Sequence, residues 1–271
     1  MADPTFRQRR LGEALQLLRE RAGMSQRDVA KRLHYNVAKV SRIENGQVPD
    51  FSALRTMLDL YGVLADEEAP YIDMWERARE KGWWHPYGLD NQGYISLEHD
   101  ARRVRTFQLG YVPGMLQTER YMRAVFAAAS PQRSKRWVEN QVAVRIRRQQ
   151  RLVGENPLHY HAIITDSALR HADREQLLYI NEMGRLSNVT VQVVLDSVGL
   201  HDGLFGSFTL LDFPYEGDPQ VLYVEHLAGA VHIEDPERVK AGTLLFKHLS
   251  KLALTPEESA AWIERMAAER W

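Results

Sequence analysis

Three polar side chains recur at regular spacing in the stretch YNVAKVSRIENG near the N-terminus. Asn36, Lys39 and Arg42 follow one another every three residues, so on a helix they form one ridge. An amide, an ammonium and a guanidinium in a row can hydrogen-bond to base edges and neutralise phosphates. Val40 and Ile43 point away from this ridge and would hold the helix to its scaffold. The pattern therefore indicates a short helix that presents a face for a polyanion.

Capping signals mark the ends of this helix and the start of the helix before it. Asn36 can cap the first turn, and Gly46 can end the helix in the left-handed conformation. The preceding segment SQRDVAKRL starts at the N-cap candidate Ser25, with Asp28 three residues later as in a capping box. Only the three residues 34–36 separate this segment from the next helix.

Two further helical segments, RRLGEALQLLRERAG and PDFSALRTMLDLYG, flank this pair. Gly23 is the expected end of the first segment, and Asp50 is the expected N-cap of the second. Apolar residues on the helices other than the ridge helix follow helical spacing: Leu11, Leu15, Leu18, Val29, Ala30, Leu33, Phe51, Leu54, Leu58 and Tyr61. Four short helices with a three-residue turn between the second and third indicate a helix-turn-helix. In that arrangement the third helix enters the major groove of double-stranded DNA.

Composition and charge place this element within a larger protein. The 271 residues suit a small domain joined to a larger one, and the absence of cysteine excludes disulfides, thiolate metal sites and cysteine nucleophiles. Residues 1–64 hold 11 Lys and Arg against 7 Asp and Glu, whereas residues 65–271 hold 24 against 29. We therefore expect a DNA-binding domain at 1–64 and a separate domain at 65–271. No apolar run reaches the ~20 residues that span a membrane, and no signal-peptide core is present, so we expect a cytoplasmic protein with no membrane contact.

The segment MSQRDVAKRLHYNVAKVSRIENG closely resembles the repressor-type (XRE, or Cro/C1-like) helix-turn-helix. The family pattern is Ser/Thr-Gln, Leu/Val-Ala and then Ser-x-Ile-Glu-Asn-Gly, and the resemblance covers about the first sixty residues. It implies a set of DNA-contacting residues: Gln26, Asn36, Val37, Ala38, Lys39, Ser41, Arg42 and Asn45. The family pattern also pairs Glu44 with an arginine of the first helix, here Arg19, as a structural ion pair.

The implied contacts differ in kind. Gln26 would hold a phosphate and buttress the third helix, Lys39 would bind a phosphate, and Arg42 is long enough to bond guanine O6 and N7. Val37 and Ala38 can contact a thymine methyl group but donate no hydrogen bond, and relatives with glutamines at these positions differ here. Direct readout would then depend mainly on Asn36 and Arg42.

The remainder of the chain alternates between helical and strand patterns. After an amphipathic helix in ADEEAPYIDMWERAREKG, with acids in its first turn, helices are expected at 117–129, 134–152, 173–187, 235–252 and 255–270. Strands are expected at 159–165, 189–195, 205–212, 220–226 and 230–234. The prediction is an all-α head of four to five helices followed by a larger α+β domain with a mixed or mostly antiparallel sheet.

Segments of the second domain resemble the body of a large actinomycete regulator family. They include KGWWHPYG, YVPGMLQTERYMRAV, VTVQVVLDSVGLHDGLFGSFTLLDF and VEHLAGAVHIEDPERV. Members join a repressor-type helix-turn-helix to a domain with no established biochemical activity, and they are described as antitoxin-like transcriptional regulators. The resemblance implies regulation through a small protein encoded nearby and supplies no catalytic residue and no cofactor.

Several acid and histidine pairs are candidates for metal or acid–base sites: His159 with His161, His201 with Asp202, Glu225 with His226, and His232 with Glu234. On a strand Glu225 and His226 point to opposite faces, and the pairs that share a face lack a third ligand. No phosphate loop, nucleophile elbow or HExxH helix is present. We therefore expect neither a metal site nor an enzyme.

Three other features are candidates for binding surfaces. Trp83, Trp84 and Tyr87 lie in a Gly/Pro-punctuated loop and could contact a partner or ligand, or cover a core. Gly203 and Gly206 permit close backbone approach or a strand bulge.

The segment SKRWVENQVAVRIRRQQR is rich in arginine, with Val138, Val142, Ile146 and Val153 as its expected buried stripe. Most of its cations are expected to face outward. They could form a second DNA surface, a solvated face that balances the acidic domain, or a contact for an acidic partner.

The sequence therefore favours a sequence-specific DNA-binding transcription regulator. Its second domain would dimerise, bind a partner or sense a ligand, and a two-fold dimer would bind an inverted repeat. The alternative is an antitoxin-like protein that neutralises a small partner and binds DNA only for autoregulation.

Overall fold

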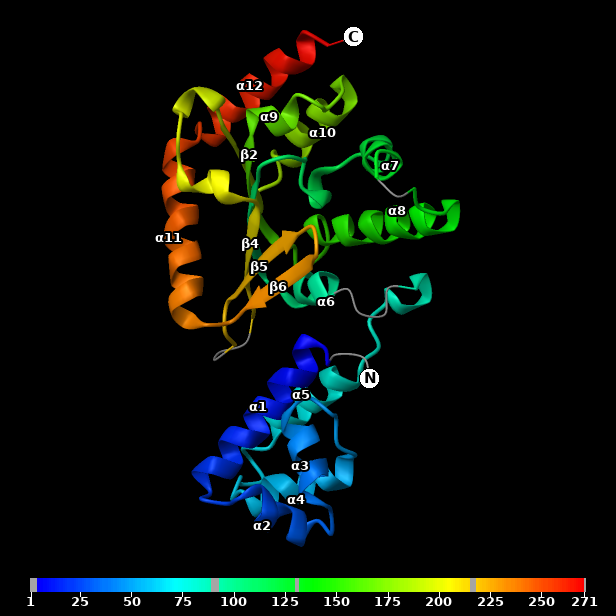
Figure 1. Ribbon diagram of the computed structural model, residues 1–271, viewed down its shortest axis with the longest axis vertical. Coiled ribbons are helices and arrows are strands. Elements are labelled where there is room, and N and C mark those ends of the chain that lie inside the picture. The colour runs from blue at the N-terminus through cyan, green and yellow to red at the C-terminus, as the bar shows by residue number, and fades with distance from the viewer. Residues whose placement is uncertain (1–3, 89–92, 130–131, 215–217, 271) are drawn as a thin grey trace. The chain divides into compact units, whose positions relative to one another are not determined.

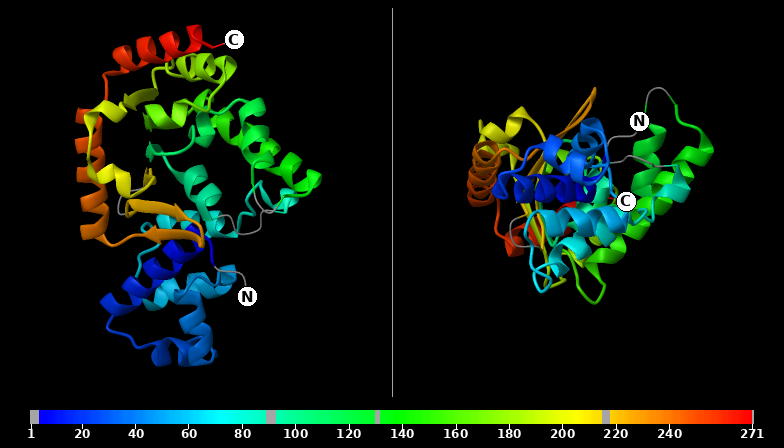
Figure 2. Two further views of the ribbon diagram at one scale, coloured as in Figure 1. Left: turned by 45° about the horizontal axis from the view of Figure 1, so that its top comes forward. Right: turned by 90° about the horizontal axis from the view of Figure 1, so that it is seen from below.

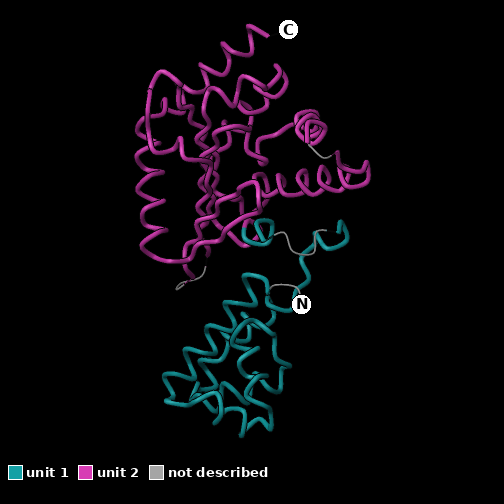
Figure 3. Tube along the Cα trace, in the orientation of Figure 1, with its two compact units in different colours: residues 1–97 teal, residues 98–271 magenta. Residues whose placement is uncertain are grey.

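The computed structural model describes residues 4–88, 93–129, 132–214 and 218–270. The chain forms two compact units, residues 1–97 and residues 98–271 (Figure 3). Among the described residues, no helix combines the length and the apolar character that crossing a bilayer requires.

The first unit consists of helices (Figure 1). They are α1 (Phe6–Arg21), α2 (Gln26–Arg32), α3 (Val37–Glu44), α4 (Phe51–Leu60), α5 (Ala69–Arg79) and most of α6 (Gly93–Asp100). The side chains of Thr5, Ser25, Asn36 and Asp50 accept a hydrogen bond from an amide in the first turn of the helix that follows each of them. These caps place the starts of α2, α3 and α4 where the sequence predicts them.

Apolar faces of α1 to α5 form one core. Leu54 and Leu58 of α4 are buried as expected, whereas Phe51 is 43% exposed and packs its ring against Trp75 of α5. The acids of 66–68 were expected in the first turn of α5, but they precede it because the helix starts at Ala69. Pro70, which fixes its own φ and lacks an amide hydrogen, suits the first turn and disfavours helix before it.

The second unit is built on a six-stranded mixed sheet with the strand order β3-β2-β1-β4-β5-β6. The strands are β1 (Arg103–Gln108), β2 (His159–Thr165), β3 (Val189–Val194), β4 (Phe208–Asp212), β5 (Val221–His226) and β6 (Gly229–Ile233). Strands β1, β2 and β3 run parallel, and β4, β5 and β6 continue the sheet by antiparallel pairing. The prediction of an α-helical head followed by an α+β domain with a mixed sheet is confirmed.

Two strand predictions were incomplete or wrong. Strand β1 was not expected, because RVRTFQ carries two arginines, yet it lies between β2 and β4. Arg105 is accommodated there because its guanidinium bonds the Asp212 carboxylate of β4. The strand predicted at 205–212 begins only at Phe208, since residues 202–205 form a 3-10 turn and Gly206 has a φ of +151°.

Helices cover both faces of the sheet (Figures 1 and 2). They are α7 (Glu119–Ala127), α8 (Lys135–Gln149), α9 (Asp166–Leu169), α10 (Arg174–Met183), α11 (Pro236–Leu252) and α12 (Pro256–Ala268). Helix α11 lies along one face, with α8 and α10 on the other. Phe246 and Leu249 of α11 pack on Phe107 of β1 within this apolar layer. Ser259 of α12 accepts the Val193 amide hydrogen at 2.9 Å, so this helix covers the β3 edge.

The expected buried stripe of α8 is only partly confirmed. Val142 is buried and Val138 is half-buried, but Ile146 and Val153 are exposed, and Val144 is buried instead. The buried side of α8 therefore differs from the side expected from the sequence, because several of its arginines point inward rather than outward. Arg148 forms two hydrogen bonds, at 2.6 and 2.7 Å, to the buried carboxylate of Glu98.

Neighbouring arginines of α8 and the following turn behave in the same way. Arg145 donates to Oε1 of Gln117 at 2.5 Å, and Arg151 donates to the backbone carbonyls of Glu98 and Ala101. These cations hold the segments around α6 and α7 to α8, so they are not part of an outward-facing basic surface.

Candidate nucleic-acid interface

Helices α2 and α3 are joined by a tight turn of four residues. The Tyr35 amide donates to the Ala30 carbonyl at 2.8 Å, and the chain reverses through His34 at a φ of +53°. His34 is the one non-glycine among the described residues with a positive φ, a conformation that costs energy for most side chains. No residue pattern in this stretch predicts this backbone geometry.

Buried apolar side chains and a close backbone contact fix α3 to the rest of the first unit. Val40 and Ile43 are almost completely buried. On the α1 side, Gly12 lies so close that a Cβ atom there would be 2.4 Å from the Glu44 carbonyl oxygen. The two backbones can meet only because residue 12 has no side chain.

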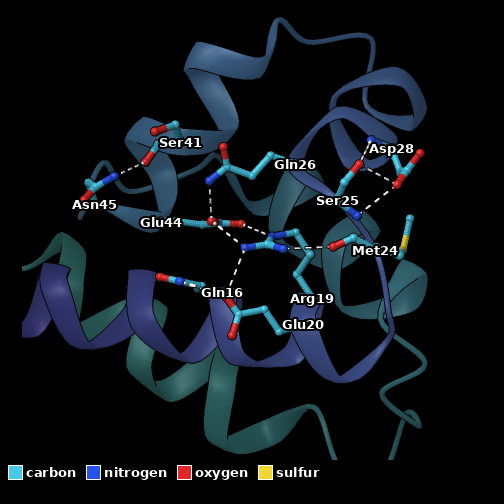
Figure 4. A network of polar contacts seen from close by, with 10 residues as sticks. All are labelled: Gln16, Arg19, Glu20, Met24, Ser25, Gln26, Asp28, Ser41, Glu44 and Asn45. Carbon is cyan, nitrogen blue, oxygen red and sulfur yellow. Dashed lines mark hydrogen bonds and ion pairs between the residues drawn. The ribbon is translucent and has the colours of Figure 1, made fainter.

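A buried ion pair ties the C-terminal end of α3 to α1 (Figure 4). Arg19 donates from Nε to Oε1 of Glu44 at 2.5 Å and from Nη2 to Oε2 at 3.1 Å. The guanidinium also donates to the Met24 carbonyl at 2.8 Å, and Gln26 of α2 donates from Nε2 to Oε2 of Glu44 at 2.7 Å. One carboxylate therefore connects α1, α2 and α3.

This arrangement explains how α3 can carry an acid without exposing its charge. The Glu44 side chain is only 2% exposed and points into the first unit, so its charge is neutralised by Arg19 and does not repel phosphate. The hydrogen bond to Glu44 raises the pKa of Arg19 above its usual value. The Gln26 amide belongs to this network. Its hydrogen bond to Glu44 supports α3, as expected, but this side chain is then not free to bind a phosphate.

The opposite side of α3 is open to solvent. Asn36, Val37, Ala38, Arg42 and Asn45 are all exposed. Together they form a surface over the N-terminal turn and one side of the helix. Of the predicted ridge, Asn36 and Arg42 belong to this surface, whereas Lys39 is half-buried.

Two residues of this surface are oriented by local contacts. Oδ1 of Asn36 accepts the Lys39 amide hydrogen at 2.8 Å, which leaves the Nδ2 donors of Asn36 facing solvent. The Lys39 ammonium lies 3.4 Å from the ring centroid of Tyr35, and the Tyr35 hydroxyl donates to Oδ2 of Asp50 at 3.4 Å. A cation over an aromatic ring is attracted to it, so Lys39 is held near the start of α3.

Tyr35 was not among the predicted contacts, although it is the residue that positions Lys39. The signal was present in the sequence, because a tyrosine and a lysine four residues apart face each other when the intervening chain enters a helix. Tyr35 therefore joins the interface as a positioning residue.

The C-terminal part of the surface holds one long cation and a turned-back amide. Arg42 is exposed and has no ion-pair partner among the described residues. Asn45 donates from Nδ2 to the Ser41 carbonyl at 2.7 Å, and Ser41 itself is half-buried. Arg42 is thus the side chain on this part of α3 with the reach and the unengaged donors that base contact requires.

Helix α2 adds cations that the sequence analysis did not single out. Arg27, Lys31 and Arg32 are exposed, and within the described part of the chain none of them forms an ion pair. Their signal was available as three basic residues in the seven-residue helix before the turn. They could add phosphate contacts beside α3.

The aromatic loop of the first unit is only partly a surface. Trp84 is 6% exposed, and its ring meets Trp83 edge-on at 5.6 Å between centroids. Trp83 also contacts Tyr87, at 6.4 Å, and both are half-buried. The three residues form one cluster of rings around the 3-10 turn His85–Tyr87.

In the described part of the second unit, none of the candidate acid and histidine pairs forms part of a metal site. Over the described ranges, no group of three or more His, Asp or Glu side chains is placed to hold a metal ion. His161 instead donates from Nε2 to Oε1 of Gln192 at 2.8 Å, and it packs edge-on against Phe246.

Large apolar side chains are exposed in the loop between β3 and β4. Leu200 is 95% exposed and Phe205 is 94% exposed, and Val198 and Leu204 are partly exposed beside them. We call these four residues the apolar loop. Gly199 within it has a φ of +82°, a conformation that glycine adopts without strain.

Comparison with known families assigns both parts of the chain. Residues 10–70 match the family model of a helix-turn-helix domain, which is the DNA-binding element described above. Residues 92–265 match the model of a domain of unknown function (DUF5753). No curated protein and no solved structure matches the chain. Because the second match spans more than half of the sequence, the chain belongs to the DUF5753 family and carries a helix-turn-helix domain ahead of that domain.

Proposed function

We propose that the protein is a sequence-specific transcription regulator of the repressor (XRE) type. Its α3 enters the major groove of double-stranded DNA, with Asn36 and Arg42 reaching base edges. The observation that carries this proposal is the exposed face of α3, where Arg42 has no ion-pair partner among the described residues, on the side of the helix away from the buried Val40 and Ile43. A surface of this chemistry, on a helix held firmly from behind, is what base readout requires.

The remaining interface residues have positioning roles. Lys39 over Tyr35 faces a phosphate, whereas the amides of Asn45 and Gly46, expected near a phosphate, donate to the carbonyls of Ser41 and Ile43. Val37 and Ala38 contact thymine methyl groups, and Ser41 is a weaker contact because it is half-buried. Gln26 orients α3 through Glu44 and lies at the N-terminus of α2, near the path of a phosphate.

Substitutions on one ridge separate base contact from phosphate contact. The operator is the sequence that the unaltered protein selects from random DNA. Arg42→Ala should weaken binding to this operator by about 1–3 kcal/mol and should weaken binding to random DNA far less, because a bidentate base contact is lost. Lys39→Ala should weaken both DNAs alike and reduce the slope of log affinity against log salt by about one. Fluorescence anisotropy titrations with the full chain measure both effects.

The matched control is Arg185→Ala, which removes an exposed arginine from the turn after α10 in the second unit and should change neither affinity. Equal losses on operator and random DNA for Arg42→Ala would remove Arg42 from base readout. An Arg185→Ala effect as large as that of Lys39→Ala would mean that DNA is bound mainly by the second unit.

We further propose that the second unit makes the protein a homodimer. The first unit of a single chain offers few cations to phosphate, so one copy should bind DNA weakly. Linking two copies raises the effective concentration of each first unit at its half-site. The apolar loop supports this proposal, because exposed leucine and phenylalanine side chains mark interaction surfaces. A two-fold dimer would bind an inverted repeat whose half-sites lie about 34 Å, one helical turn, or a multiple of it apart.

The same loop favours a second candidate function. A small protein encoded nearby could cover Leu200 and Phe205, so that neutralising this partner is the main role and DNA binding serves autoregulation. Purification of the full chain from native extract distinguishes the two. A stoichiometric small protein that leaves when Leu200 and Phe205 are changed to serine supports neutralisation, and a homodimer without it supports the regulator.

A further inference from the structure

A pocket of about 440 Å³ lies beside the first half of α11 in the second unit. Its volume is within the range of small-molecule sites, roughly 300–1,000 Å³. Pro236, Val239 and Leu244 contribute apolar walls, and Lys240, Thr243 and Lys247 contribute polar groups. Neither the proposed DNA contacts nor the apolar loop uses any of these residues.

The three polar residues share one side of α11. They are spaced by three and four residues, which places them above one another on a helix. Both lysines are exposed, and in the described part of the chain neither has an ion-pair partner. Two ammonium groups are thus free to meet an anion at the pocket.

The hydroxyl between them is unsatisfied. Oγ1 of Thr243 is buried and has no hydrogen-bond partner among the described residues. A threonine in a helix commonly bonds the carbonyl four residues earlier, and leaving a buried hydroxyl unpaired costs free energy. Because this oxygen is closed to solvent, a ligand's acceptor can supply the missing partner only after the Thr243 side chain turns about χ1 toward the pocket.

The charge of the lining selects the sign of the ligand. Glu234 is the one acid among the lining residues, against the two lysines, so the lining carries a net positive charge. The apolar walls favour a hydrocarbon or aromatic body next to the charged group. We propose that this pocket binds a small organic anion, with a carboxylate between Lys240 and Lys247 that also accepts from Thr243, and with its apolar body against Pro236 and Leu244.

Binding of such an anion goes beyond the proposed DNA-binding function and does not depend on it. As an effector site, the pocket would serve the regulator, and that consequence rests on the proposed function. The test therefore measures ligand binding to the full chain without DNA, so that failure of one proposal leaves the other intact.

Isothermal titration calorimetry with octanoate, octylammonium and octanol tests the charge and the apolar body together. Octanoate should bind saturably, octanol should bind less tightly, and octylammonium should not bind. Changing Lys240→Gln or Lys247→Gln should weaken octanoate by about two- to five-fold each, as for exposed ion pairs, and by about ten-fold together. The matched control is Lys251→Gln, an exposed lysine of α11 outside the pocket lining, which should leave the affinity unchanged.

Thr243→Val distinguishes a ligand-binding hydroxyl from a structural one. It should weaken octanoate while the melting temperature of the free protein stays the same or rises, because an unsatisfied buried hydroxyl is removed. Absence of saturable octanoate binding, equal binding of octylammonium, or unchanged affinity in the double lysine variant would overturn the site. The comparison of the three probes on the unaltered protein decides the charge preference even where a variant folds poorly.

Discussion

Removing Arg19 should lower the free energy of unfolding of the first unit far more than removing an exposed arginine of the same helix. Arg19→Met keeps an apolar side chain but leaves the Glu44 carboxylate buried, with Gln26 as its remaining side-chain donor. Two hydrogen bonds of 2.5 and 3.1 Å are lost from side chains that are 10% and 2% exposed. A charge pair about 4 Å apart at an effective dielectric constant of about 20 interacts with about 4 kcal/mol. Breaking a buried pair costs about 3–5 kcal/mol, so the two magnitudes agree.

The loss should be specific to the unpaired charge. The double variant Arg19→Met/Glu44→Leu should recover most of the stability, since replacing a buried pair by apolar residues is often neutral or stabilising. Arg21→Met removes an exposed arginine from the last turn of α1 and should change the free energy of unfolding by less than about 0.5 kcal/mol.

Amide hydrogen exchange in the full chain measures the free energy of opening for α1 and α3 separately from the second unit. A loss of less than about 1 kcal/mol in the free energy of opening for Arg19→Met, the range of an exposed pair, would show that the buried charge does not stabilise the first unit. A double variant as unstable as the single one would show that the cost comes from lost packing instead.

Three further outcomes follow from contacts in both units. Gly12→Ala should destabilise the first unit by about 1–3 kcal/mol through overpacking against the Glu44 carbonyl, and unchanged exchange of the α3 amides would contradict this close contact. Burial lowers the pKa of His161 from 6.5, so its contribution to stability is complete above about pH 6.5 and is lost as the pH falls below that value. His161→Gln should therefore reduce the drop in melting temperature between about pH 7.5 and about pH 5.5, and an identical drop would exclude His161 as its source. Leu200→Ser/Phe205→Ser should convert the proposed dimer to a monomer in light scattering, and an unchanged mass would move the interface elsewhere.

The first unit could be predicted closely from the sequence because its signals are local. Ser25, Asn36 and Asp50 each cap a helix three residues before the amide that they bind, and Val40 and Ile43 follow the helical period. Such signals act within one or two turns, so they can be read without knowing what lies nearby in space. The same holds for the exposed face of α3 that carries Arg42, because it is the face that remains when the apolar face is buried.

Strand β1 and helix α8 could not be predicted in the same way. RVRTFQ is too polar to indicate a central strand, and Arg105 becomes acceptable only beside Asp212, more than a hundred residues away. The apolar residues of α8 do not by themselves determine which side of the helix is buried. That side is determined by Glu98, which binds Arg148, and by the backbone carbonyls that accept hydrogen bonds from Arg151. A buried charge is stable only with its partner, and the partner is known only from the fold.

The sequence alone determined the helix-turn-helix, the mixed α+β class of the second unit and the ridge proposed to bind DNA. Tertiary structure decided which way the charged side chains point: Glu44 into the core toward Arg19, and the arginines of α8 onto buried acceptors. It also decided that Gly12 is required where α1 meets α3, and that Thr243 faces a pocket without a partner. The reason is one of range, because helical period and capping act between neighbours along the chain. Charge pairing, close backbone contact and cavities depend on residues that only folding brings together.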